Sequence, residues 1–144
     1  MNFKNRDLCR RLRIVPFLTS TVLLLYACQQ ESAVWLEPGS NATHVVLLIG
    51  RYRGDPSGSA SVTSVDVTTC TDTDRVHAYH YWGIIRGGND IPIHRVEYGI
   101  PPKGFGEHHP ALPLSPGCYH VRISGTGRLR FVVSSEGRVS EVDN

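Results

Sequence analysis

The stretch that decides the fold is CYHVRISGTGRLRFVV, residues 118 to 133. Apolar side chains recur at every second position on both sides of Gly125-Thr126-Gly127, a sequence typical of a turn. Because successive side chains of a β-strand point to opposite faces, this stretch predicts two strands joined by a turn, each with one apolar face. The residues of that face are Tyr119, Val121, Ile123, Leu129, Phe131 and Val133.

Similar signals recur along the chain, and no segment keeps a helical period over ten residues. Further strands are predicted at 33–37, 43–49, 61–70, 76–85, 91–100 and 138–142. Strands at spacings near ten residues, separated by turn signals, favour an all-β fold. We expect a single antiparallel β-sandwich, immunoglobulin-like or related, with seven or eight strands. In the strand 76–85, Trp82 is expected in the core, with Tyr79 and Tyr81 on the opposite face.

A proline-rich segment at 99–117 interrupts this pattern, with five prolines and four glycines in nineteen residues. A segment of this length and composition predicts a long loop. Its apolar side chains favour an ordered loop packed against the sandwich; they are Ile100, Phe105, Leu112 and Leu114.

The first 27 residues differ from the rest of the chain. Five basic residues come first, and an apolar run of 13 residues follows, from Ile14 to Tyr26. A basic start, a short apolar run and a small residue are typical of an export signal, and the run is shorter than the roughly 20 residues of a membrane span. The predicted organisation is a signal peptide at 1–27, a short tether at 28–33 and one β-sandwich domain at 34–144.

Cys28 follows this apolar run directly, with Leu25 three positions before it and Ala27 one before it. The arrangement resembles the lipobox of bacterial lipoproteins, in which the cysteine becomes the first residue and its thiol carries a diacylglycerol. The resemblance implies a lipid anchor at Cys28 in the cell envelope. Gln29 rather than Asp follows, which implies the outer membrane if the cell has one. The alternative is a secreted protein without an anchor.

A second resemblance covers the last third of the chain. The pattern from Tyr98-Gly99 through Gly104-Phe105 and Pro116-Gly117 to Phe131 and Val139 is similar to that of small, uncharacterised bacterial lipoproteins. This resemblance implies no activity.

The formal net charge of +2 is positive only because of the leader, which holds five of the fifteen basic residues and one of the thirteen acidic residues. The remaining chain has ten basic and twelve acidic residues and a net charge of −2. Nucleic-acid binding needs a clustered positive surface, so we expect no nucleic-acid partner.

Cys70 and Cys118 are the two cysteines left after the leader and Cys28 are set aside. Because exported proteins meet an oxidising environment, this even pair predicts a disulfide. The disulfide would close the loop between Cys70 and Cys118. Chain-entropy arguments predict that closing a loop of this length stabilises the folded state by about 4 kcal/mol. A reactive thiol at Cys118, activated by the nearby His120, is the alternative.

Candidate binding residues fall in two groups. Tyr79 and Tyr81, with Phe105 of the proline-rich loop, could bind a peptide, a protein or a glycan of the envelope. His108 and His109 of the same loop are candidate metal ligands, which gives the alternative function of a periplasmic metal-binding protein.

The sequence contains no nucleophile elbow and no motif of paired carboxylates, which are patterns that would indicate catalysis. We therefore expect a non-enzymatic envelope protein without a cofactor, and a small hydrolase is the remaining alternative.

Overall fold

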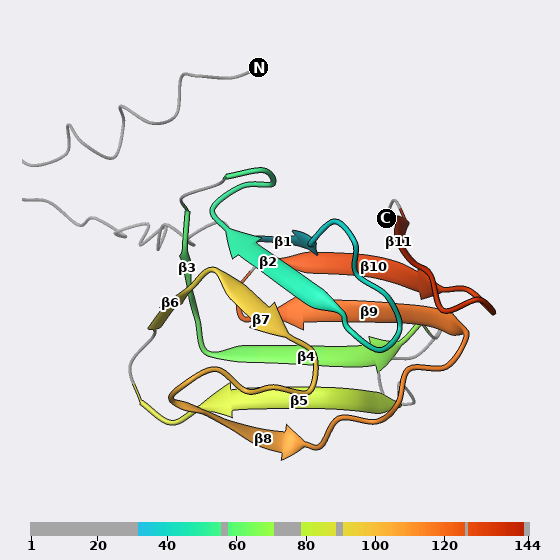
Figure 1. Cartoon of the computed structure of the whole chain (residues 1–144). Coiled ribbons are helices and arrows are strands. Elements are labelled where there is room, and N and C mark those ends of the chain that lie inside the picture. Colours follow the sequence, from blue (N-terminus) through green and yellow to red (C-terminus); the bar gives the residue numbers. More distant parts are fainter. Residues whose placement is uncertain (1–31, 56–57, 71–78, 89–90, 126, 143–144) are drawn as a thin grey trace, which may run out of the picture.

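The computed structural model describes residues 32–55, 58–70, 79–88, 91–125 and 127–142. All regular structure in these residues is β, so the predicted all-β class is confirmed (Figure 1). The described part holds no helix of the length and apolarity that crossing a membrane requires. Its strands are β1 (Ala33–Leu36), β2 (Val46–Gly50), β3 (Ala60–Val62), β4 (Ser64–Thr69), β5 (His80–Arg86), β6 (Ile91–Ile93), β7 (Arg95–Glu97), β8 (Phe105–His109), β9 (Gly117–Ile123), β10 (Arg128–Val133) and β11 (Val139–Val142).

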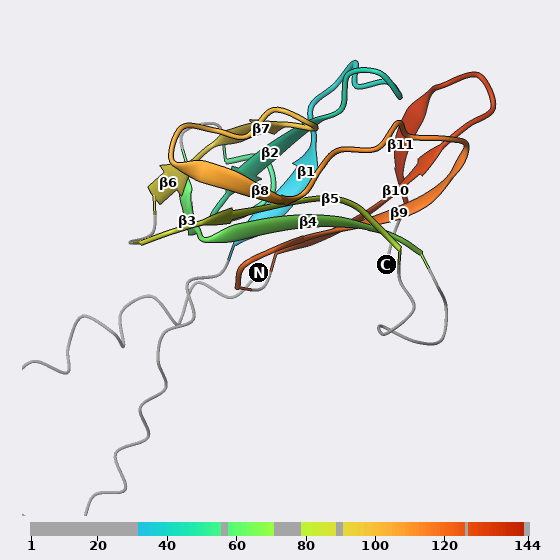
Figure 2. The ribbon, with the colours of Figure 1, turned by 90° about the horizontal axis from the view of Figure 1, so that it is seen from below.

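These strands form three antiparallel sheets. The largest has six strands in the order β11-β10-β9-β4-β5-β8, the second has the order β1-β2-β7, and the third pairs β3 with β6. Figure 2 shows β1, β2 and β7 lying over one face of the six-stranded sheet. The core lies between these layers, and the other face of the large sheet is its outer face.

The predicted single sandwich of seven or eight strands is wrong, because the described residues form eleven strands in three sheets. Two predicted strands are each divided at a corner where the chain passes from one sheet to another. At Thr63, between β3 and β4, the backbone N–H donates to Ser124 Oγ (2.7 Å) and the carbonyl accepts from Arg86 N–H (2.9 Å). At His94, between β6 and β7, the carbonyl accepts from Ile49 N–H (2.8 Å). At each corner the backbone groups have no partner in a β-ladder, and these hydrogen bonds satisfy them instead.

The proline-rich segment is not a continuous loop, because it contains β8 at the edge of the large sheet. The stretch from Lys103 to His109 lacks proline, so its backbone N–H groups can pair with β5. The prolines flank this strand on both sides, as expected when they cannot donate to a ladder. Phe105 and Leu114 pack against the core, as the sequence predicted, together with Ala111. The same prediction is wrong for Ile100, whose side chain is 57% exposed.

The core contains every residue of the apolar face of the 118–133 stretch. Phe131 is fully buried, and its ring stacks on Tyr119 with ring centroids 5.2 Å apart. Trp82 is fully buried, as predicted, and its indole N–H donates to Glu107 Oε1 (2.9 Å). Burying a large apolar side chain contributes about 1.5–3 kcal/mol, so this face supplies much of the stability of the fold.

The predicted disulfide is confirmed. Cys70, directly after β4, is bonded to Cys118 in β9, and their Cα atoms lie 5.2 Å apart. The N–H of Cys70 also donates to the carbonyl of Cys118 (2.9 Å), so the bond links neighbouring strands. Neither cysteine is a free thiol.

Replacing Phe131 by alanine is expected to lower the free energy of unfolding by about 3–5 kcal/mol, because it leaves a cavity in the core. Urea denaturation followed by circular dichroism measures this loss. The control is Val142→Ala in the same sheet, where the side chain is 38% exposed. A loss of similar size in both variants would contradict the central position of Phe131.

Candidate functional site

Positive side chains gather on the outer face of the six-stranded sheet. The alternation that buries Val121 and Leu129 turns the intervening side chains of β9 and β10 away from the core. The Cα partners across these strands are Arg122 with Arg128 and His120 with Arg130. We call these four residues the basic face: His120, Arg122, Arg128 and Arg130.

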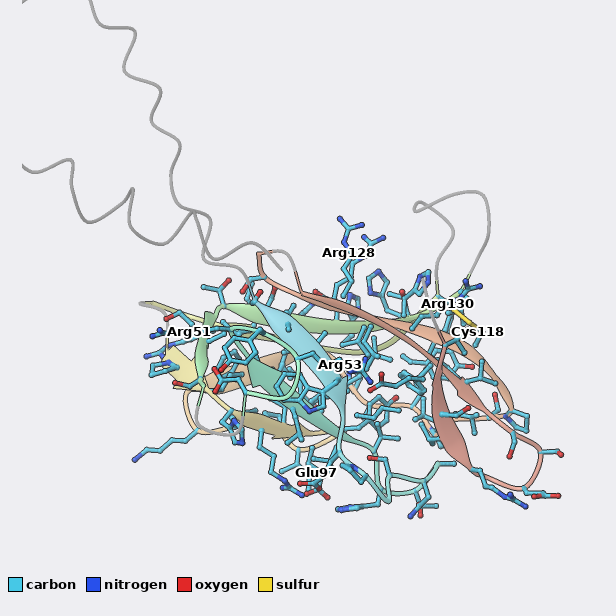
Figure 3. All side chains as sticks on the ribbon, turned by 90° about the horizontal axis from the view of Figure 1, so that it is seen from above. Arg51, Arg53, Glu97, Cys118, Arg128 and Arg130 are labelled. Carbon is cyan, nitrogen blue, oxygen red and sulfur yellow. A yellow bond between two sulfur atoms is a disulfide. The ribbon has the colours of Figure 1, made fainter. Side chains whose placement is uncertain are left out.

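The pairing of Arg122 with Arg128 has an energetic cost, because like charges directly opposite each other on a sheet repel. Asp66, the Cα partner of Arg122 on β4, offsets part of this cost, and Arg128 has no such partner on its other side, where Arg128 lies beyond the end of β11. Both arginine side chains are exposed, and within the described residues neither makes a hydrogen bond or ion pair. They line a hollow of about 260 Å³ together with His120, Val121 and Leu129. Figure 3 shows Arg128 pointing away from the sheet. Two guanidinium groups beside one hollow can donate to an anion that neutralises both.

Arg130 is held more firmly than this pair. Its side chain is partly buried, and its Nε–H donates to Sγ of Cys118 (3.4 Å). The disulfide therefore fixes one end of the basic face.

A histidine cluster lies next to the basic face, across β4 and β5. The register of β8 against β5 shifts between Gly83 and Ile84, so that His109 pairs with Gly83, Glu107 pairs with Ile84 and His108 is the extra residue. Such a bulge turns consecutive side chains toward one face. We define the cluster as His80, His108, His109 and Asp66.

Contacts within the histidine cluster are close. Nε2 of His108 lies 3.1 Å from Oδ1 of Asp66. The ring of His109 stacks on that of His80 at 4.3 Å and lies 4.5 Å from that of His108. Gly83 makes room for this packing, since a Cβ there would lie 2.6 Å from Cε1 of His108.

The pKa of His109 lies below its ordinary value of 6.5. Burial is the main cause, the positive charges of His80 and His108 add to it, and Asp66 acts in the opposite direction. The folded state therefore favours neutral His109. The stability that this residue contributes is fully present above pH 6.5 and is lost as the pH falls through the folded-state pKa.

The predicted metal ligands do not lie in a loop, because His108 and His109 belong to β8. Their rings contact Asp66 and His80 and do not converge on one point. In the part of the chain that the structure describes, no group of three or more histidine, cysteine, aspartate or glutamate residues could hold a metal ion.

The predicted aromatic site is not assembled either. Tyr79 is 61% exposed and its ring lies 5.6 Å from that of Tyr81. Tyr81 does not lie on the face opposite Trp82, because the register of β4 against β5 shifts there and its ring packs on Tyr119 at 4.9 Å. Phe105 pairs with Arg86, at the other end of β5 from Tyr79.

Sequence reasoning missed the arginines of the basic face because the net charge of the mature chain is negative. The signal is present in the hairpin stretch, where Arg122, Arg128 and Arg130 occupy the alternate positions. Reading the register across the turn would have placed Arg122 opposite Arg128.

No protein-family model matches this chain, and no curated protein or solved structure matches it either.

Replacing His80 by asparagine is expected to raise the pKa of His109 toward 6.5, because it removes a neighbouring positive charge and a stacked ring. Histidine ring proton shifts recorded by NMR against pH measure this change. The control is His94→Asn, since His94 lies between β6 and β7. An unchanged pKa of His109 in His80→Asn would contradict the coupling of the two rings.

Proposed function

We propose that this protein is a lipid-anchored component of the cell envelope and a non-enzymatic binding module. Its ligand is an anion that binds at the basic face. The observation that carries the proposal is the pair Arg122 and Arg128, which face each other across β9 and β10 without an ion pair in the described residues.

The anchored location is supported by the sequence before the domain. Residues 1–28 resemble a lipoprotein signal that ends at Cys28, which lies outside the described residues. The bond between Cys70 and Cys118 agrees with an oxidising compartment such as the periplasm or the cell surface. A diacylglyceryl group at Cys28 would supply two acyl chains, enough for stable anchoring.

The preference for an anion follows from how the charges are distributed. Among the acidic residues in the described strands of the large sheet, only Asp66 lies on the outer face. It is the Cα partner of Arg122 on β9, and its Oδ1 lies 3.1 Å from Nε2 of His108. Glu107 and Glu141 point to the core side, where they bond to Trp82 and to the backbone of Leu36. Figure 3 shows Arg128 and Glu97 on opposite sides of the molecule. Three arginines against one aspartate leave the outer face of β4, β9 and β10 with a net positive charge, although the mature chain is acidic as a whole.

Binding fits this site better than catalysis. The hollow that Arg122 and Arg128 line is open to the surface and lies on the outer face of the sheet. Catalytic sites usually exclude water to strengthen their electrostatic interactions, which an open face does not do. Guanidinium groups also remain protonated, so they bind anions and do not act as general acids or bases near pH 7.

The intact mass of the protein extracted from membranes with detergent tests the anchor and the oxidation state together. We expect a chain that begins at Cys28 with the added mass of acyl groups, and an increase of two protons on reduction. The variant Cys28→Ser is the control and should lack the acyl mass. A lipid-free mass for the native chain would contradict the anchor.

Titration with inorganic pyrophosphate tests the basic face. We expect the arginine Nε–H signals of Arg122 and Arg128 to shift in NMR spectra of the isotope-labelled full chain. Arg122→Gln/Arg128→Gln should weaken binding roughly tenfold, because two exposed charge pairs contribute about 1.4 kcal/mol in total.

The matched control is Arg51→Gln/Lys103→Gln, which removes the same charge from exposed positions outside the basic face. Equal weakening in both double variants would show that only the net charge matters and would contradict a site between β9 and β10.

A further inference from the structure

We propose that the anion bound by the basic face is the phosphate of anionic phospholipids in the membrane that holds the Cys28 anchor. This inference rests on the proposed function, because the anchor brings the sheet to the lipid surface. The domain would then lie with the outer face of its six-stranded sheet toward the membrane.

The N-terminal end of the domain is fixed beside the basic face. The N–H of Gly127, in the turn between β9 and β10, donates to Oγ of Ser32 (3.2 Å). Arg128 is the next residue, and Arg122 is its Cα partner on β9. Figure 2 shows the start of β1 next to this turn.

The chain between the anchor and this point is short. Cys28 precedes Ser32 by four residues, and four residues of fully extended chain span at most about 14 Å. The end of the sheet that carries Arg122 and Arg128 therefore remains within about 14 Å of the anchor, plus the reach of its own side chains. Anionic lipids attract basic residues within about a Debye length of the surface, about 8 Å at physiological ionic strength.

Charge complementarity selects one orientation of the tethered domain. The layer of β1, β2 and β7 carries Glu37 and Glu97, which pair with Arg95 at 3.1 Å and 3.9 Å. Because these charges compensate each other, an anionic surface would attract the outer face of the large sheet more strongly than this layer. The repulsion between Arg122 and Arg128 would also be relieved once lipid phosphates lie between them.

Phosphate recognition requires only that several donors surround one anionic group. Arg122 and Arg128 have both guanidinium groups available, and the hollow between them is open to the surface. Arginine suits this role because its planar group can bind two phosphate oxygens at once. A soluble phosphate would use the same chemistry, so the experiment must separate the two sources.

The experiment uses the full chain as the cell processes it, extracted with neutral detergent. It is reconstituted in nanodiscs of phosphatidylcholine alone or with about 30% phosphatidylglycerol, whose negative surface potential attracts basic residues. A water-soluble phenylglyoxal reagent modifies accessible arginines, and peptide mass spectrometry gives the rate at each position. A third sample contains the protein in neutral nanodiscs with inorganic phosphate at the same phosphate concentration.

We expect Arg122 and Arg128 to react roughly tenfold more slowly in the anionic nanodiscs only, in line with the attraction of two arginines to such a surface. High salt should remove the protection, since 1 M salt shortens the Debye length to about 3 Å. Arg51, which lies outside the basic face, is the internal control and should react at the same rate in both nanodiscs.

Matched variants assign the protection to the basic face. Arg128→Gln should abolish most of the protection of Arg122, whereas Lys103→Gln should leave it unchanged. Equal loss in both variants would overturn the proposal, because the effect would then depend on net charge.

The possible outcomes test the binding of lipid phosphate and the anchor at Cys28 separately. Association with both nanodiscs without protection of Arg122 and Arg128 would overturn the inference and leave the anchor intact. Association with anionic nanodiscs alone, with protection, would contradict the anchor and overturn the tethered arrangement, and would leave binding of lipid phosphate at the basic face intact. Equal protection by inorganic phosphate in neutral nanodiscs would overturn the lipid source in favour of a soluble anion.

Discussion

The alternation of side chains along β9 is the constraint on which the rest of the structure depends. This strand lies between β10 and β4, and every second residue points into the core. Tyr119, Val121 and Ile123 bury one face, so His120 and Arg122 must point outward. The basic face is therefore a direct consequence of the core, and a register slip of one residue would place charges in the interior.

Two bulges modify this alternation on the other side of β4. One turns Tyr81 toward Tyr119 and the core, and the other inserts His108 next to His109. The first removes a tyrosine from the surface where we expected a binding site. The second creates the histidine cluster, which needs the missing side chain of Gly83. Local irregularities of this kind decide which side chains of β5 and β8 reach the surface.

The molecule separates its charges although its net charge is small. Glu107 and Glu141 lie on the core side of the large sheet, and the arginines of β9 and β10 lie on its outer face with Asp66 as the one acidic residue of the described strands there. The disulfide and the contact of Ser32 with Gly127 hold the two ends of this face in place. If Cys28 carries a lipid, the same contact determines which face of the domain lies near the membrane.

By itself, the sequence determined the all-β class, the apolar face of the hairpin stretch, the burial of Trp82 and the pairing of Cys70 with Cys118. These features follow from short-range periodicity and from the count of cysteines, which need no knowledge of distant contacts. Only the tertiary structure decided the three sheets, the strand at Phe105–His109 and the meeting of Arg122 with Arg128. Corners, bulges and registers depend on which strands pair. That choice is set by packing and hydrogen bonds between residues far apart in the chain, so no local pattern can reveal it.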